Sequence, residues 1–292
     1  MIPGAQAWSA VPREAGLRYT VDMTVSADSS MTSSGVCWDP ADWQAHNEAY
    51  AALNRLIEDW WTQIPVELTA GRAVSASSVQ AALDQALRST ASWSRGVARV
   101  AADVHTAVPG YASGPPGDGP IQAGALVRIH LSVHCAQRPR VSVSCMQTAY
   151  LGNEAPPTMR EAFEVVRRGR DVTADYLREA FADERDVHGW EVDSVCRREM
   201  TGLGYGAFVL HRTGYSLGYD ERHEAGPALD DGDLTEQRLL RPGMAFAVEP
   251  GLYLPERFGV QTGLSLYVDH GGRVHIAAPT PQASIRLIAV QD

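Results

Sequence analysis

The fold is decided by two neighbouring stretches in the last third of the chain, HRTGYSLGYDERHE at residues 211–224 and PGMAFAVEPGLYLPERFGV at residues 242–260. The apolar segment MAFAVEP in the second stretch is predicted to be a β-strand. Its Glu249 puts a carboxylate in apolar surroundings, where the charge is costly unless it is paired or hydrogen-bonded. The first stretch contributes His211 and His223, and histidine is the side chain best suited to move protons near neutral pH. We therefore expect a polar site within a strand-rich region.

Helices and strands alternate along the rest of the sequence, which favours an α+β or α/β class. Residues 1–39 are predicted to be an N-terminal extension, in which residues 17–25 have the alternation of a strand, and residues 40–292 are predicted to form one domain. Strands are also expected over 125–132 and 141–151, and in the segments GLSLYV, RVHIA and SIRLIAV. Apolar residues recur at helical spacing over 39–61, 77–89, 157–170, 172–181 and 191–200, which predicts five helices.

The composition indicates an acidic protein with a substantial core. The chain of 292 residues is 45% hydrophobic and has a formal net charge of −10, which argues against nucleic-acid binding because such surfaces need a basic stripe. No apolar run approaches the ~20 residues that cross a bilayer, and the N-terminus shows no signal peptide, so we expect a cytoplasmic protein without a membrane partner. The four cysteines form no CxxC pair, which argues against a structural zinc site.

The two C-terminal stretches resemble the methionine aminopeptidase, prolidase and creatinase superfamily. Its EVD…AR…GYG..F.HRTGH.IG pattern is similar to EVDSVCRREMTGLGYGAFVLHRTGYSLG, and its L.PGM.F..EPGIY pattern is similar to LRPGMAFAVEPGLY. More loosely, GALVRIHLS and SCMQTAYLG resemble the superfamily's GDLVLIDLG and DITRT..LG. The resemblance extends from about residue 40 to the end. It implies the pita-bread fold, an α+β architecture with a curved antiparallel sheet flanked by helices.

The resemblance also shows which metal ligands this chain has lost. The superfamily's metallopeptidases hold two metal ions through two aspartates, one histidine and two glutamates. The aspartate positions fall on His130 and Ser144, the histidine position on Tyr215 and the last glutamate position on Gly263, so that only Glu249 is kept. A dinuclear centre needs carboxylates that bridge cations about 3.5–4 Å apart. The substitutions therefore predict an enzyme without a metal or other cofactor.

The expected substrate is a small amino-acid-like or nitrogen-containing molecule. The creatinase and ectoine-hydrolase relatives imply C–N bond hydrolysis, and elimination or cyclisation stays open. His130 or His223 would activate water or move a proton, and Tyr215 with Arg212 would stabilise an anionic centre. The predicted catalytic residues are His130, His211, Tyr215, His223 and Glu249, and the predicted substrate-binding residues are Arg212, Glu224 and Ser144.

Two alternatives to this metal-independent enzyme stay open. One is a binding protein without catalysis, because pita-bread domains that have lost their metal ligands act elsewhere as peptide or histone binders. The other is a metallo-aminopeptidase-like enzyme with one metal ion, held by His130, Glu249 and either His211 or His223, since two histidines and one carboxylate can hold iron or zinc. A homodimer is also left open, although the separate N-terminal domain of creatinase- and prolidase-like members is not recognisable in the sequence.

Overall fold

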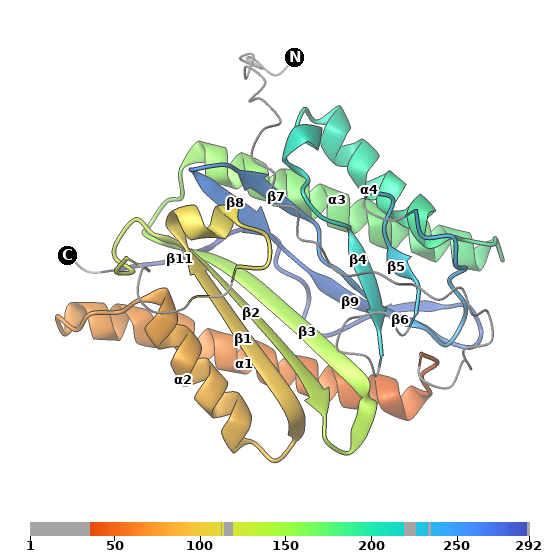
Figure 1. Ribbon diagram of the computed structural model, residues 1–292, viewed down its shortest axis with the longest axis horizontal. Coiled ribbons are helices and arrows are strands. Elements are labelled where there is room, and N and C mark those ends of the chain that lie inside the picture. The colour runs from red at the N-terminus through yellow and green to blue at the C-terminus, as the bar shows by residue number, and fades with distance from the viewer. Residues whose placement is uncertain (1–35, 112, 114–118, 219–225, 233–234, 291–292) are drawn as a thin grey trace. The chain divides into compact units, whose positions relative to one another are not determined.

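Two long strands, β2 (Leu126–Cys135) and β3 (Arg138–Leu151), form an antiparallel hairpin in the computed structural model of the protein (Figure 1). The strand β1 (Trp93–Ala102) pairs with β2, and the short β11 (Arg286–Ile288) runs parallel to β3, which gives the first sheet the order β1-β2-β3-β11. The structure describes residues 36–111, 113, 119–218, 226–232 and 235–290. The expected strand over 17–25 lies outside these ranges, and the division of the chain after residue 39 stays a prediction.

A second sheet contains the apolar segment that the sequence singled out. Its five strands are antiparallel to their neighbours and have the order β10-β9-β6-β4-β5. A separate hairpin of β7 and β8 follows β6 along the chain. The strands of these two units are β4 (Gly214–Leu217), β5 (Ala228–Leu229), β6 (Ala245–Val248), β7 (Gly251–Leu254), β8 (Phe258–Gln261), β9 (Leu264–Val268) and β10 (Val274–Ile276). Within the described residues, antiparallel strands and helices confirm the α+β class.

Helices cover the sheets. Residues of α1 (Pro40–Thr69) and α2 (Ala76–Ser89) share one hydrophobic cluster with β1, β2 and β3. Residues of α3 (Pro157–Ala182) and α4 (Gly189–Gly202) share another with β6 and β9. Two short 3-10 helices, η2 (Asp103–Ala107) and η3 (Gly206–Phe208), lie in connections. Each sheet therefore has one face covered by helices.

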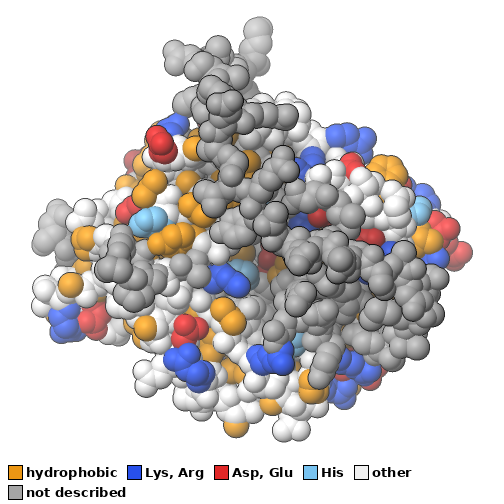
Figure 2. All heavy atoms as spheres, viewed as in Figure 1, with side chains coloured by type: hydrophobic (Ala, Val, Ile, Leu, Met, Phe, Trp, Pro, Cys, Tyr) orange, Lys and Arg blue, Asp and Glu red, His pale blue; other side chains and the backbone are white. Residues whose placement is uncertain are grey.

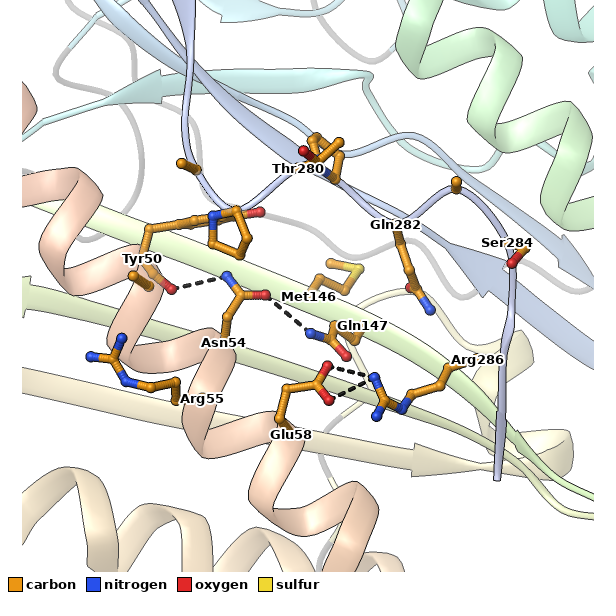
Figure 3. A pocket seen from close by; sticks show the side chains of 15 residues that line it. Tyr50, Asn54, Arg55, Glu58, Met146, Gln147, Thr280, Gln282, Ser284 and Arg286 are labelled. Carbon is orange, nitrogen blue, oxygen red and sulfur yellow. Dashed lines mark hydrogen bonds and ion pairs between the residues drawn. The ribbon is translucent and has the colours of Figure 1, made fainter. Parts of the chain in front are cut away.

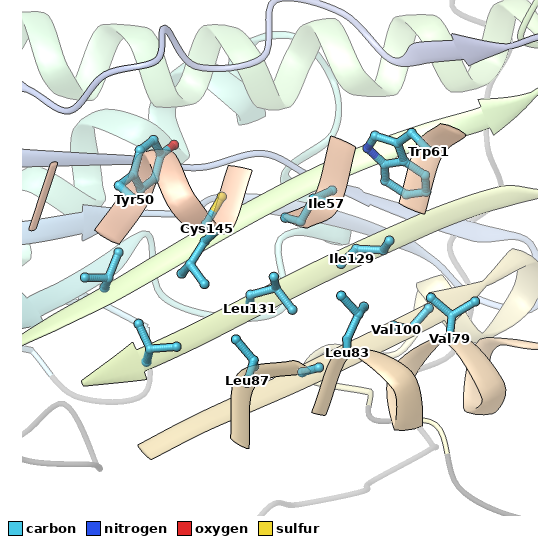
Figure 4. Close-up of a cluster of buried hydrophobic side chains, with 14 of the residues drawn as sticks. Tyr50, Ile57, Trp61, Val79, Leu83, Leu87, Val100, Ile129, Leu131 and Cys145 are labelled. Carbon is cyan, nitrogen blue, oxygen red and sulfur yellow. The ribbon is translucent and has the colours of Figure 1, made fainter. Parts of the chain in front are cut away.

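The alternation of side chains along β2 decides which face holds the site. Ile129 and Leu131 point toward α1 and α2, where they pack with Ile57 and Leu83 (Figure 4). Because successive side chains on a strand point to opposite faces, His130 lies on the face away from these helices. The apolar packing of β2 thus fixes the orientation of a predicted catalytic residue.

The start of α1 is tied to the start of β3. Asp39 caps the helix and forms a capping box with Asp42, and Pro40 is its first residue, as the sequence predicts. The Asp42 carboxylate is fully buried, and it pairs with Arg138 at 2.7 Å and Arg140 at 2.6 Å. A buried carboxylate held by two guanidiniums fixes the helix against the hairpin.

The predicted helices over 157–170 and 172–181 are a single helix, α3. Gly169 lies inside this helix. A Cβ at Gly169 would lie 3.0 Å from the sulfur atoms of Cys196 and Met200 on α4, so the glycine allows α3 and α4 to approach each other closely. The sequence also did not predict β1, β4, β5, β7 and β8 as strands.

Acidic and basic side chains are interspersed over the described part of the face in Figure 2, and no patch of one charge sign covers it. Within the described residues, no helix has the length and apolar character that crossing a membrane requires.

Candidate functional site

Glu249 lies directly after β6 and is 6% exposed. Ser144 Oγ donates a hydrogen bond to Glu249 Oε1, and the Tyr215 hydroxyl donates to Oε2 at 3.1 Å. Burial raises the pKa of Glu249, while the hydrogen bonds from Ser144 and Tyr215 act in the opposite direction. The carboxylate that the sequence predicts as costly is therefore hydrogen-bonded at both oxygens.

His130 reaches the same place from the first sheet. Its Nε2 atom lies 2.8 Å from Ser144 Oγ. Ser144 pairs with Ser132 in the register of β2 and β3, so His130, two residues earlier, is its diagonal neighbour on the same face. The serine hydroxyl thus lies between an imidazole nitrogen and a carboxylate oxygen, and it joins the two sheets.

Tyr215 stays a phenol in this environment. It lies opposite Ala247 of β6, which places Glu249, two residues further on, on the same face. Burial and the nearby Glu249 raise the pKa of Tyr215 well above its ordinary value. The guanidinium carbon of Arg212 lies 5.6 Å from the centre of the tyrosine ring. Tyr215 is therefore a hydrogen-bond donor at neutral pH.

His211 is connected to the backbone of Glu249 and not to its carboxylate. Its Nδ1 donates to Arg212 O at 2.6 Å, and its Nε2 lies 2.7 Å from the Tyr253 hydroxyl. That hydroxyl lies 3.2 Å from Gln261 Oε1, and Gln261 Nε2 donates to Glu249 O at 3.1 Å. Burial lowers the pKa of His211 to about 4, so the ring is neutral at pH 7. This geometry suits a positioning role.

Asp193 fixes the segment that carries Arg212 and Tyr215. Its buried Oδ1 accepts from the backbone N–H of Thr213 at 2.8 Å and from the Thr213 hydroxyl at 2.5 Å. Its Oδ2 pairs with Arg197 at 2.5 Å. Sequence reasoning missed this residue as part of the site, although it belongs to the EVD segment of the C-terminal motif.

The structure brings together four of the predicted site residues, His130, Ser144, Tyr215 and Glu249, with Arg212 beside them. His211 joins them through Tyr253. His223 and Glu224 lie outside the described residues. The roles assigned to all of these residues stay predictions.

Two metal ions do not fit the described residues. No group of three or more His, Cys, Asp or Glu side chains in the described part of the chain is arranged to hold a metal. At the last glutamate position, a Cβ on Gly263 would lie 3.0 Å from Glu249 Cγ, so the space of a second carboxylate is partly taken by the first. The donors that converge are one imidazole nitrogen and one carboxylate oxygen, both next to Ser144 Oγ. Two such donors would contact one ion and not a pair of ions.

A hollow of about 770 Å³ lies elsewhere, between α1 and residues 278–286 (Figure 3). Gln147 donates to Asn54 Oδ1 at 3.0 Å at its wall, and Arg286 pairs with Glu58 at 2.6 Å. Gln147 and Ser144 are an odd number of residues apart on β3, so they face opposite sides of the sheet. None of the described site residues lines this hollow.

Comparison with known proteins gives the family. Residues 43–270 match the model of metallopeptidase family M24. The Xaa-Pro dipeptidase of Lactobacillus delbrueckii subsp. lactis is 33% identical over 108 residues, which cover 37% of this chain and 26% of that protein. Among solved structures, dipeptidase PepE from Mycobacterium ulcerans matches with a TM-score of 0.70 at 21% identity, over 87% of this chain and 62% of that one. X-Pro aminopeptidase from Thermotoga maritima MSB8 matches with a TM-score of 0.71 at 19% identity, over 88% and 65%.

These matches confirm the predicted pita-bread superfamily and correct the predicted function. The match covers about a quarter of the curated relative and less than two thirds of each solved chain. The prediction of a metal-independent enzyme for small nitrogen-containing molecules is wrong, because the matching family is one of metallopeptidases and the similar proteins are dipeptidases and an aminopeptidase. The chain belongs to metallopeptidase family M24.

Proposed function

We propose that this chain hydrolyses short peptides and that its activity depends on one divalent metal ion contacted by His130 and Glu249. The observation that carries the proposal is the convergence of His130 Nε2 and Glu249 Oε1 on Ser144 Oγ within an M24 domain. Similar members of the family are dipeptidases, which supports short peptides as the substrate class.

The two donors suit a single transition-metal ion. Imidazole nitrogen and carboxylate oxygen are ordinary ligands of zinc, iron and manganese. An ion held there would polarise the peptide carbonyl and lower the pKa of a water molecule. Two protein ligands are fewer than the three that catalytic zinc sites usually have. We therefore expect weak metal binding, with activity that depends on added metal.

The other side chains of the site have roles that follow from their protonation. Tyr215 keeps its proton because its pKa is raised, and its one O–H, which donates to Glu249, would turn from this carboxylate to an oxyanion that forms beside it. His211 is neutral because its pKa is lowered to about 4, and it holds Tyr253 in place. Ser144 keeps the imidazole and the carboxylate close together.

The test is a hydrolysis assay on chelator-treated protein with a panel of dipeptides that includes Xaa-Pro sequences. Activity should be absent after chelation and should return in a saturable manner on titration with Mn²⁺, Co²⁺ or Zn²⁺. Glu249→Ala and His130→Ala should both abolish this metal-dependent recovery of activity. Arg88→Met, on the exposed face of α2, should leave the recovery unchanged. Full activity after chelation, or hydrolysis that survives Glu249→Ala, would contradict the proposal.

A second candidate is a domain that binds peptides without cleaving them. It is favoured by Ser144 and Gly263, which stand at ligand positions of the superfamily and offer no carboxylate. Calorimetric binding of a dipeptide, combined with the lack of turnover at every metal concentration, would select this candidate.

The location and assembly of the protein are part of the same proposal. We propose that it works in the cytoplasm as a homodimer. Cell fractionation with an antibody and sedimentation of the purified chain would test the two points separately.

A further inference from the structure

Arg99 lies beside His130 on the face that carries the candidate site. The two residues are directly opposite each other in the register of β1 and β2, and directly opposite residues of an antiparallel pair share a face. The neighbours Ala98 and Val100 belong to the cluster packed with α1 and α2, so Arg99 points away from these helices. The side chain of this half-buried residue is thus directed to the side of His130 and Glu249.

Arg212 approaches the same centre from the second sheet. It directly precedes Thr213 and β4, and its guanidinium lies over the ring of Tyr215, whose hydroxyl donates to Glu249. Arg99 and Arg212 both act on the Glu249 carboxylate through their positive charge. One guanidinium from each sheet therefore lies near the candidate centre.

Among the described residues, the guanidiniums of Arg99 and Arg212 form no ion pair and no hydrogen bond. Arginines elsewhere, such as Arg167 and Arg197, pair with carboxylates at 2.6 and 2.5 Å. A guanidinium presents five donors in a planar fork that fits a carboxylate at two points. As far as the described residues show, these two guanidiniums are thus suited to anionic groups of a ligand.

We propose that the site selects short peptides with two carboxylates, one bound by Arg99 and the other by Arg212. A dipeptide with an acidic side chain has both, the side-chain carboxylate and the C-terminal one. The inference rests on the proposed function for its substrate class, and it names Arg99 and Arg212 as the residues that determine specificity.

The test compares three peptides of nearly equal size by calorimetry on chelator-treated protein: Ala-Glu with two carboxylates, Ala-Gln with one, and Ala-Gln amide with none. Because a hydrogen-bonded charge contact contributes roughly tenfold or more to binding, affinity should fall by about tenfold at each removal of a carboxylate. Arg99→Met should abolish one of these two decreases in affinity, and Arg212→Met should abolish the other. Arg99→Lys should restore part of the loss, and Arg88→Met, on the exposed face of α2, should keep both decreases.

The outcomes separate this inference from the proposed function. Equal affinity for Ala-Glu and Ala-Gln would overturn the inference even if peptides are hydrolysed. The same holds if both decreases in affinity persist in each methionine variant. Graded, arginine-dependent binding without hydrolysis at any metal concentration would support the inference and overturn the proposed function.

Discussion

Glu249 occupies the space into which a side chain at Gly263 would point: a Cβ at residue 263 would lie 3.0 Å from Glu249 Cγ. The superfamily has a glutamate at this position, and this chain has instead one carboxylate that bonds to Ser144 and Tyr215. The lack of a side chain at Gly263 thus leaves room for the Glu249 side chain.

The first prediction concerns this contact. Gly263→Ala should lower the free energy of unfolding by ~1–3 kcal/mol, because the new methyl group crowds Glu249 in a fully packed site. It should also weaken metal activation, since Glu249 must shift away from Ser144. Chemical denaturation and the metal titration measure both effects. Gly202→Ala is the matched control, since a Cβ there meets nothing within 4 Å. An unchanged Gly263→Ala protein would show that Glu249 is free to move.

The second prediction concerns a variant that restores a carboxylate at a ligand position. Ser144→Asp places a second carboxylate next to Glu249, and two adjacent carboxylates repel each other until a cation binds between them. The variant should melt lower than the wild type without metal, and its melting temperature should rise more on addition of Mn²⁺. Ser144→Ala, which adds no carboxylate, should show a smaller rise than the wild type. A Ser144→Asp melting temperature that does not respond to metal would rule out an ion at this place.

The third prediction concerns the acid stability of the core. His46 is fully buried among Trp38, Trp43 and Tyr50, and neither ring nitrogen has a hydrogen-bond partner in the described residues. Burial lowers the pKa of His46 to about 3 from 6.5. Because the folded state binds fewer protons than the unfolded state, stability should be lost as the pH falls from about 6.5 to about 3.

Replacement of His46 should remove this part of the pH dependence. His46→Leu should flatten the loss of stability over that range, and at pH 7 it should be close to neutral or stabilising, since an apolar group has no unsatisfied nitrogen. Denaturant melts at a series of pH values would measure it. A slope as steep as that of the wild type would mean that other groups cause the acid loss.

A fourth prediction concerns Asp193. Asp193→Ala should cost ~3–5 kcal/mol of stability, because it breaks a buried ion pair with Arg197 and frees the polar groups of Thr213. It should also lower peptide turnover more than metal affinity, as the segment with Tyr215 loses its anchor. The control is Asp175→Ala, whose exposed pair with Arg178 is worth at most about 0.5 kcal/mol. Equal losses in the two variants would refute the anchoring role.

Much of the fold was predictable because its signals are local. The cap of α1 at Asp39 and the apolar stripe of α2 depend on neighbours within a few residues, and the structure has both. The division of α3 into two helices was wrong, because the close approach of α4 to Gly169 is not a local signal. β1 was missed for the same reason: β2 and α2 determine its pairing and burial.

The sequence by itself determined the family and the identity of the residues at each ligand position, since both follow from motifs of fixed spacing. The tertiary structure decided how those residues meet. Ser144 lies between His130 and Glu249 because strands from distant parts of the sequence come together there. It also decided that Arg99 lies beside His130, which depends on strand register. Residue types alone favoured a metal-independent reaction, which the match to metallopeptidase family M24 corrects, and only the structure gives the distances of His130 and Glu249 to Ser144. Long-range packing sets such distances, and a one-dimensional pattern does not contain them.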